Sequence, residues 1–191
     1  MKYKMTIRDI AGFCPEEAIW KMMADVSECL MNDGVGNELS PDSVMVDGNS
    51  FILNNSTQVI ENEFHAPEHR EGQPFDEKEE VWSLGAIAYY ASTGHIVFGG
   101  YGSKYQKEHP LVTLPALPKG LQSLTSLFQK CLCYDPKERI GLNDLNDLVR
   151  KGLEECGKQR RKKTKSSNDK EIKDNEVKYT GEKWPEEMIE L

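Results

Sequence analysis

The sequence predicts a mainly α-helical domain with one small β-hairpin over residues 1–156. Apolar residues recur there at helical spacing in several separate segments, and two short β-type runs flank a tight-turn signal. One helical segment, residues 77–93, is apolar on nearly every side from Val81 onward, which is typical of a helix buried all round. A chain of 191 residues is long enough to enclose such a core.

The N-terminal half supplies the first helix and the hairpin. The helix is predicted to begin at residues 15–17, where a proline and two acids suit a first turn, and to end at the turn residues 32–34. The β-type runs 44–46 and 51–53 flank residues 47–49, Asp-Gly-Asn, which is a hairpin signal.

The C-terminal half supplies further helices after the central one. Residues 121–132 and 145–153 each have the apolar spacing of an amphipathic helix. Residues 99–120, rich in Gly, Pro and Tyr, are expected to be irregular with one short helix.

The last part of the chain, residues 157–191, is predicted to be a flexible, charged tail. It holds almost nothing apolar up to Glu182, so it cannot form a core. Residues 184–191, which include Trp, Met, Ile and Leu, are a short apolar motif that forms either a small helix or a frayed end.

Charge is distributed unevenly along the chain, whose net charge is −8. Residues 1–156 hold 14 basic and 24 acidic residues, net −10, whereas residues 157–191 hold 10 and 8, net +2. The acidic body is expected to repel nucleic acid and to prefer a positively charged partner. The basic block 158–165 is a candidate nuclear-import or polyanion-binding patch, with a solvated linker as the alternative.

Several features favour a cytoplasmic protein. The first 23 residues show no signal peptide, and the longest apolar run, residues 81–91, is about half of what spans a bilayer. The five cysteines have no framework spacing, which favours a reducing compartment. The basic block leaves a nuclear location open.

Three motifs follow one another along the chain: Ala-Pro-Glu at residues 66–68, Glu-Val-Trp-Ser-Leu-Gly at 80–85, and the run 131–140, which contains Pro136 and Arg139. In this order and at this spacing they resemble the C-terminal lobe of a protein kinase. The resemblance covers residues 5–155 and implies a kinase-like C-lobe that begins after the hinge, without the N-terminal β lobe.

The resemblance also implies structural roles for single residues. Glu68 is expected to pair with Arg139, and Trp82 to pack beneath the segment that Glu68 ends. Glu80 stands where the family has an Asp that bonds back to the catalytic loop.

The catalytic positions that the resemblance implies hold other residues than those the family uses. Residues 36–43 take the place of the catalytic loop, with Glu38 at the base, Ser40 at the phosphate-binding Lys and Ser43 at the metal-binding Asn. Asn54 stands in place of the second metal carboxylate. Phosphoryl transfer depends on those groups, so we expect no catalysis, no cofactor and no metal.

The arrangement is similar to the kinase non-catalytic C-lobe (KIND) domains, which bind peptide segments of partner proteins. The sequence therefore favours a catalytically inactive pseudokinase that serves as an interaction or scaffold module. One alternative is a divergent or truncated kinase that needs a second chain, for which Glu38 is the only support. The other is a non-functional kinase remnant.

A protein or peptide partner of basic or mixed charge is expected, and we expect no membrane binding. The candidate contact residues form an acidic cluster that precedes the central helix: Glu71, Asp76, Glu77, Glu79 and Glu80. The alternative is that these acids solvate a loop and favour the start of the helix. His65 and His69 have metal-ligand spacing for a helix, but Pro67 between them argues against one.

Overall fold

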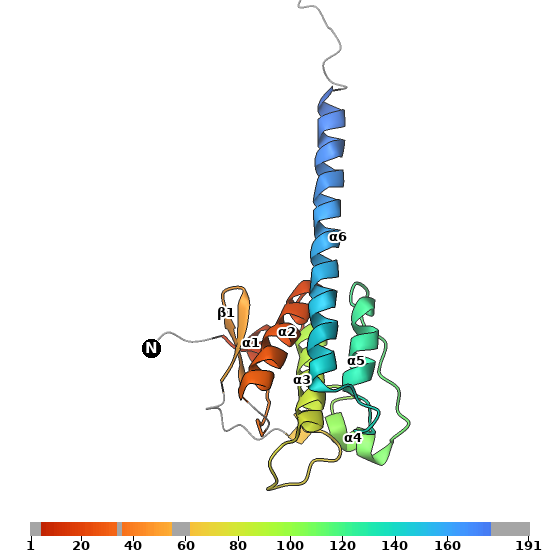
Figure 1. Ribbon diagram of the computed structural model, residues 1–191. Helices are drawn as coiled ribbons and strands as arrows, with labels where there is room; N and C mark the ends of the chain where they lie inside the picture. Colours follow the sequence, from red (N-terminus) through yellow and green to blue (C-terminus); the bar gives the residue numbers. More distant parts are fainter. Residues whose placement is uncertain (1–4, 34–35, 55–61, 177–191) are drawn as a thin grey trace, which may run out of the picture. The chain divides into compact units, whose positions relative to one another are not determined.

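The computed structural model describes residues 5–33, 36–54 and 62–176, and it divides into two units, residues 1–153 and 154–191. The first unit is built mainly from helices (Figure 1). The elements in chain order are α1 (Ile7–Ile10), α2 (Glu16–Asp33), β1 (Val44–Asp47), β2 (Ser50–Leu53), the 3-10 turn η1 (Asn62–Phe64), α3 (Glu77–Thr93), α4 (Gly102–Glu108), the 3-10 turn η2 (Gln122–Leu124), α5 (Thr125–Cys131) and α6 (Leu142–Glu176).

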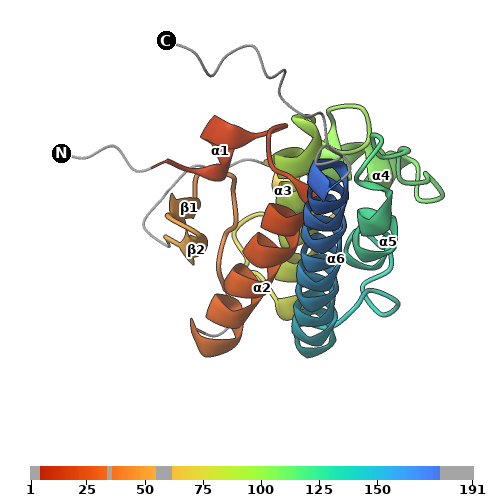
Figure 2. The same ribbon diagram turned by 90° about the horizontal axis from the view of Figure 1, so that it is seen from above.

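The core is organised around α3, which contacts α1, α2, α5 and η1. Figures 1 and 2 show α3 between α2 and α5. Every residue from Glu79 to Tyr89 is buried, which confirms the prediction of a helix surrounded by the domain. The helix ends at Gly94, which adopts a left-handed φ of 74° and donates its N–H to the Tyr90 carbonyl.

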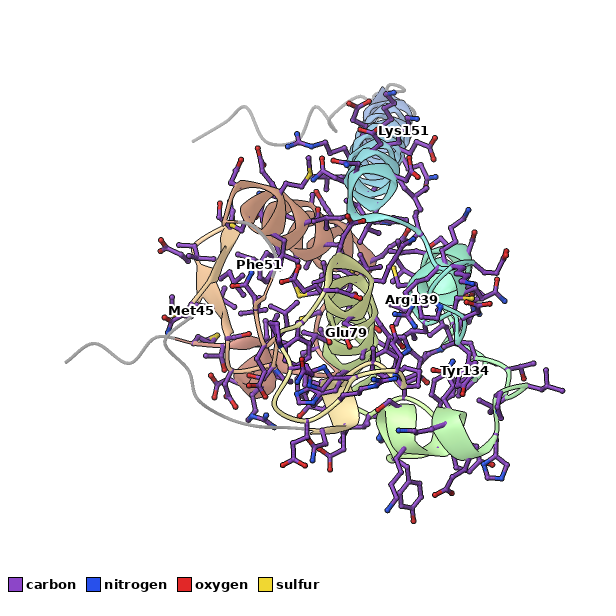
Figure 3. All side chains as sticks on the ribbon, turned by 60° about the horizontal axis from the view of Figure 1, so that its bottom comes forward. Met45, Phe51, Glu79, Tyr134, Arg139 and Lys151 are labelled. Atoms are coloured by element: carbon purple, nitrogen blue, oxygen red, sulfur yellow. The ribbon has the colours of Figure 1, made fainter. Side chains whose placement is uncertain are left out.

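The hairpin consists of two short antiparallel strands, β1 and β2, and β2 packs against α2. Met45 pairs with Ile52 and Val46 with Phe51, and Thr6 forms an isolated bridge to Met45. Phe51 lies toward the helices (Figure 3), and its backbone N–H donates to Asp25 Oδ2 at 2.9 Å, which ties β2 to α2.

The predicted fold class is confirmed. Among the described residues β1 and β2 are the only strands, so the described chain is mainly helical and contains no β lobe. The short helix expected within residues 99–120 is α4, and the pattern at 121–132 divides into η2 and α5.

The tail differs from the expectation in part, because α6 continues to Glu176 and residues 157–176 are helical. The sequence argument considered only that these residues cannot form a core. Lys, Arg, Glu and Gln are nevertheless strong helix formers, and a helix needs only local hydrogen bonds. Lys158 lies 3.9 Å from Glu154 one turn earlier. The apolar motif 184–191 lies outside the described residues.

No helix within the described ranges is long and apolar enough to cross a membrane.

Candidate functional site

The loop at residues 36–43, which stands in the position of the catalytic loop, is fastened to α3 by Glu80. The Glu80 Oε1 accepts hydrogen bonds from the backbone N–H of Gly36 at 2.9 Å, from the backbone N–H of Asn37 at 2.8 Å and from Asn37 Nδ2 at 3.1 Å. Glu80 is fully buried, and its Oε2 has no hydrogen-bond partner. Burial raises the pKa of the Glu80 carboxyl, while the N–H donors oppose that rise. The role of Glu80 is therefore to hold the loop.

Within that loop, Ser40 and Ser43 bond to each other. Ser43 Oγ donates to the Ser40 carbonyl at 2.8 Å and accepts the Ser40 N–H at 3.0 Å. Both side chains are buried. The backbone N–H of Asn54 donates to the Ser43 carbonyl at 2.7 Å, so this position also braces the turn.

Glu38, at the position of the base, faces a histidine. Its Oε1 lies 3.0 Å from His65 Nε2, and because a carboxylate only accepts, the Nε2–H is the donor. The His65 side chain is 8% exposed and that of Glu38 is 35% exposed. Burial lowers the pKa of His65 below its ordinary 6.5, and the Glu38 carboxylate opposes that change. Glu38 is thus engaged by the His65 imidazole.

His65 belongs to a ring cluster with His69 and Phe75. The His69 and Phe75 rings are stacked at 3.9 Å and 7°, and the His65 ring meets both edge-on, at 5.0 Å and 4.9 Å. His69 Nδ1 lies 3.2 Å from Glu79 Oε1. Each imidazole therefore joins the segment 62–75 to a carboxylate of another element.

This cluster lines a groove of about 700 Å³ that runs between the segment 62–75 and α4. Glu38, Glu71, Lys104 and Lys107 are its charged lining residues. Lys104 and Lys107 form no ion pair with another side chain of the described residues, and both lysines are exposed. Phe75 and Pro74 add apolar surface. The groove thus offers positive, negative and apolar groups within one surface.

Most of the acidic cluster has partners inside the fold. Asp76 caps α3 by accepting the Glu79 N–H at 2.9 Å, and Glu79 Oε2 accepts the Asp76 N–H at 2.8 Å. Glu77 Oε1 accepts the Leu142 N–H at 2.7 Å. Glu71 alone of the five predicted contact residues lines the groove. The alternative interpretation, that these acids favour the start of a helix, explains the contacts of Asp76, Glu77 and Glu79, because each carboxylate accepts a backbone N–H at the start of α3 or α6.

Glu68 and Arg139 form a bidentate ion pair in the structure. Arg139 Nη1 lies 2.5 Å from Glu68 Oε1, and Nη2 lies 3.0 Å from Oε2. The Arg139 side chain is 0% exposed and also donates to the carbonyls of Lys78 and Cys133, at 2.7 and 2.9 Å. Figure 3 shows Arg139 beside the first turns of α3, close to Glu79. The pair fastens the middle of the segment 62–75 to the core.

Trp82 forms a second connection between elements of the core. Its side chain is fully buried, and Nε1 donates to Gln106 Oε1 at 3.0 Å. Gln106 Nε2 in turn donates to the Leu132 carbonyl at 2.7 Å. Trp82 thereby links α3 to α4 and to the end of α5.

Sequence reasoning missed two groups of groove residues. It considered His65 and His69 only as metal ligands, whereas each pairs with a carboxylate; within the described part of the chain no three His, Cys, Asp or Glu side chains form a metal-holding group. It also gave Lys104 and Lys107 no role. The lysines lie one turn apart on a short helix, and that spacing is the signal that could have identified them.

Comparison with known proteins gives one consistent result. A family model described as protein kinase domain matches residues 36–149. The chain is similar to the dual specificity protein kinase Ttk of Danio rerio, with 28% identity over 135 residues, which is 66% of this chain and 13% of that protein. It is also similar to the dual specificity protein kinase TTK of Mus musculus, with 25% identity over 126 residues, 61% of this chain and 14% of that protein. The chain thus spans a small fraction of the length of these curated relatives.

Proposed function

This chain belongs to the protein kinase domain family, and from that premise we propose that it is a non-catalytic member, comparable to KIND domains, which binds a segment of a partner protein in the groove beside α4. The observation that carries the proposal is the state of the catalytic positions. They are used for internal bonding, while the groove next to them remains lined with charged and apolar groups.

Magnesium–ATP does not fit the residues at these positions. The family uses two carboxylates, a Lys and an Asn to hold the metal and phosphates. Here Ser40 and Ser43 are buried and bonded to each other, Asn54 replaces a carboxylate, and Glu38 is paired with His65. A single carboxylate engaged by an imidazole is a poor substitute for that set, so no phosphoryl-transfer step is assigned to this chain.

The groove fits an extended peptide segment of mixed charge. Lys104 and Lys107 on α4 would meet an acidic side chain, and Glu71 on the opposite side would meet a basic one. Phe75 and Pro74 would pack against an apolar side chain between them. The acidic body as a whole, net −10 over residues 1–156, would speed the encounter with a segment that carries basic residues.

The test uses charge reversals on the full chain, after a partner has been identified by affinity capture. Glu71→Lys and Lys104→Glu are expected to weaken binding by about tenfold, which corresponds to about 1.4 kcal/mol. Neither side chain has an ion-pair partner in the described structure, so the fold should stay intact. Reversals at Glu77 or Glu79 are unsuitable, because they would remove the hydrogen bonds that these carboxylates accept from the backbone N–H groups of Leu142 and Asp76.

Matched controls are Glu138→Lys and Lys119→Glu, which make the same charge changes at exposed positions outside the groove. They should leave the affinity within about twofold of the parent. If the groove variants and these controls bind equally well, the partner does not occupy the groove and the proposal is wrong.

A further inference from the structure

We propose, on the basis of the proposed function of the groove, that this groove responds to protons: protonation of His65 loosens the segment 62–75 and gives the lining a net positive charge. The inference concerns regulation of the same surface. It depends on the position of the two imidazoles between the segment that carries them and the elements that hold it.

Each imidazole is the connection between the segment 62–75 and a neighbour. His65 reaches Glu38 in the loop 36–43, and His69 reaches Glu79 in α3. The two rings also touch each other and enclose Phe75, which is 7% exposed. Two cationic rings placed 5.0 Å apart would repel each other, and each would also lose hydration in this apolar contact.

Charged groups of both signs face this cluster. They come from the loop 36–43, from η1, from the segment 69–79 and from α4: Glu38, Glu63, Glu71, Glu79, Lys104 and Lys107. The carboxylates of Glu38 and Glu63 favour protonation of His65, whereas burial and the neighbouring His69 oppose it. Burial is the largest of these influences, so the pKa of His65 is lowered.

The sign of the pH effect follows from that direction. Because the folded pKa lies below the ordinary value of 6.5, an opened segment takes up a proton on His65 more readily than the closed one. Neutral His65 therefore stabilises the closed form of the segment 62–75 relative to the opened form. This stabilisation is present above about pH 6.5 and is lost as the pH falls through the pKa of His65 in the folded protein. Acidification therefore favours opening.

The charge of the groove lining changes when His65 takes up a proton. The lining has two carboxylates, Glu38 and Glu71, and two ammonium groups, Lys104 and Lys107, so its formal charge is zero while both imidazoles are neutral. One added proton, on His65, makes it +1. A basic partner segment should then be released on acidification, and an acidic segment should be held more tightly.

The experiment is hydrogen exchange of the full chain at about pH 7.5 and about pH 5.5, with rates corrected for the intrinsic pH dependence of exchange. Protection of the segment 62–75 should fall by about threefold or more on acidification, relative to the protection of α3. Unchanged protection, or a fall that is equal in α3, would overturn the proposal.

The chain supplies its own control, since its four histidines are His65, His69, His95 and His109, and the last two are exposed. His65→Asn with His69→Asn should remove the pH response, and His95→Asn with His109→Asn should keep it. A response that follows the second pair instead contradicts the proposal.

If the first double variant does not fold, nuclear magnetic resonance titration of the parent decides. The His65 ring should titrate below about 6.5, and the amides of the segment 62–75 should follow the same midpoint. If the amide signals of the segment 62–75 do not change with the titration of the His65 ring, the segment is not coupled to His65 and the proposal is wrong. Neither readout involves a partner, so a failure here leaves the proposed function standing, and a loss of partner binding leaves this result standing.

Discussion

Replacing Arg139 with methionine should destabilise the domain by about 3–5 kcal/mol, the cost of breaking a buried ion pair from one side. The guanidinium is 0% exposed and bonds to both Glu68 oxygens. It also satisfies the carbonyls of Lys78 and Cys133, which would be left without this donor. For a domain of this size, that loss corresponds to a Tm lower by about 6–20 °C. Thermal or urea unfolding measures it.

Arg150→Met is the matched control, because Arg150 pairs with Glu28 at 2.9 Å but the two side chains are 51% and 55% exposed. Exposed pairs contribute about 0–1 kcal/mol. The double variant Glu68→Leu with Arg139→Met should recover part of the loss, since no charge is then left without its partner. If Arg139→Met unfolds no more readily than Arg150→Met, the ion pair does not fasten the segment 62–75.

Trp82→Ala should cost about 3–5 kcal/mol, the usual loss for removing a large aromatic side chain from a core. Trp82 is fully buried, and its removal also leaves the Gln106 Oε1 without its donor. The connection from α3 through Gln106 to the Leu132 carbonyl is then interrupted. Equilibrium unfolding in urea gives the free energy directly.

Phe13→Ala is the control for Trp82, because the Phe13 side chain is 87% exposed. Its loss should change stability by no more than about 0.5 kcal/mol. Equal unfolding midpoints for the Trp82 and Phe13 variants would show that α3 is not the core helix described above.

Local patterns in the sequence predicted the elements well where one rule dominated. The acids at residues 77–80 and the apolar run after them fixed the bounds of α3, and Asp-Gly at residues 47–48 fixed the hairpin turn. The Glu68–Arg139 contact joins residues 71 positions apart, so no local pattern implies it. It came from the resemblance of the surrounding motifs to a protein kinase C-lobe.

The groove could not be predicted in the same way. Glu38 and His65 meet only because the loop 36–43 is drawn to α3 by the buried Glu80. Asp76 and Glu79 look like a docking surface in the sequence, but their carboxylates face backbone N–H groups at the helix start. A sequence shows the sign of a charge and its spacing, whereas its partner depends on tertiary packing.

The central claim is that this member of the kinase domain family does not use ATP, and thermal unfolding of the full chain with millimolar Mg–ATP tests it most directly. A ligand present at 100 times its Kd would stabilise the fold by about 2.7 kcal/mol, which raises Tm by about 5–11 °C for a domain of this size. We predict the same Tm with Mg–ATP as with magnesium alone. A rise of several degrees that requires ATP would contradict the account.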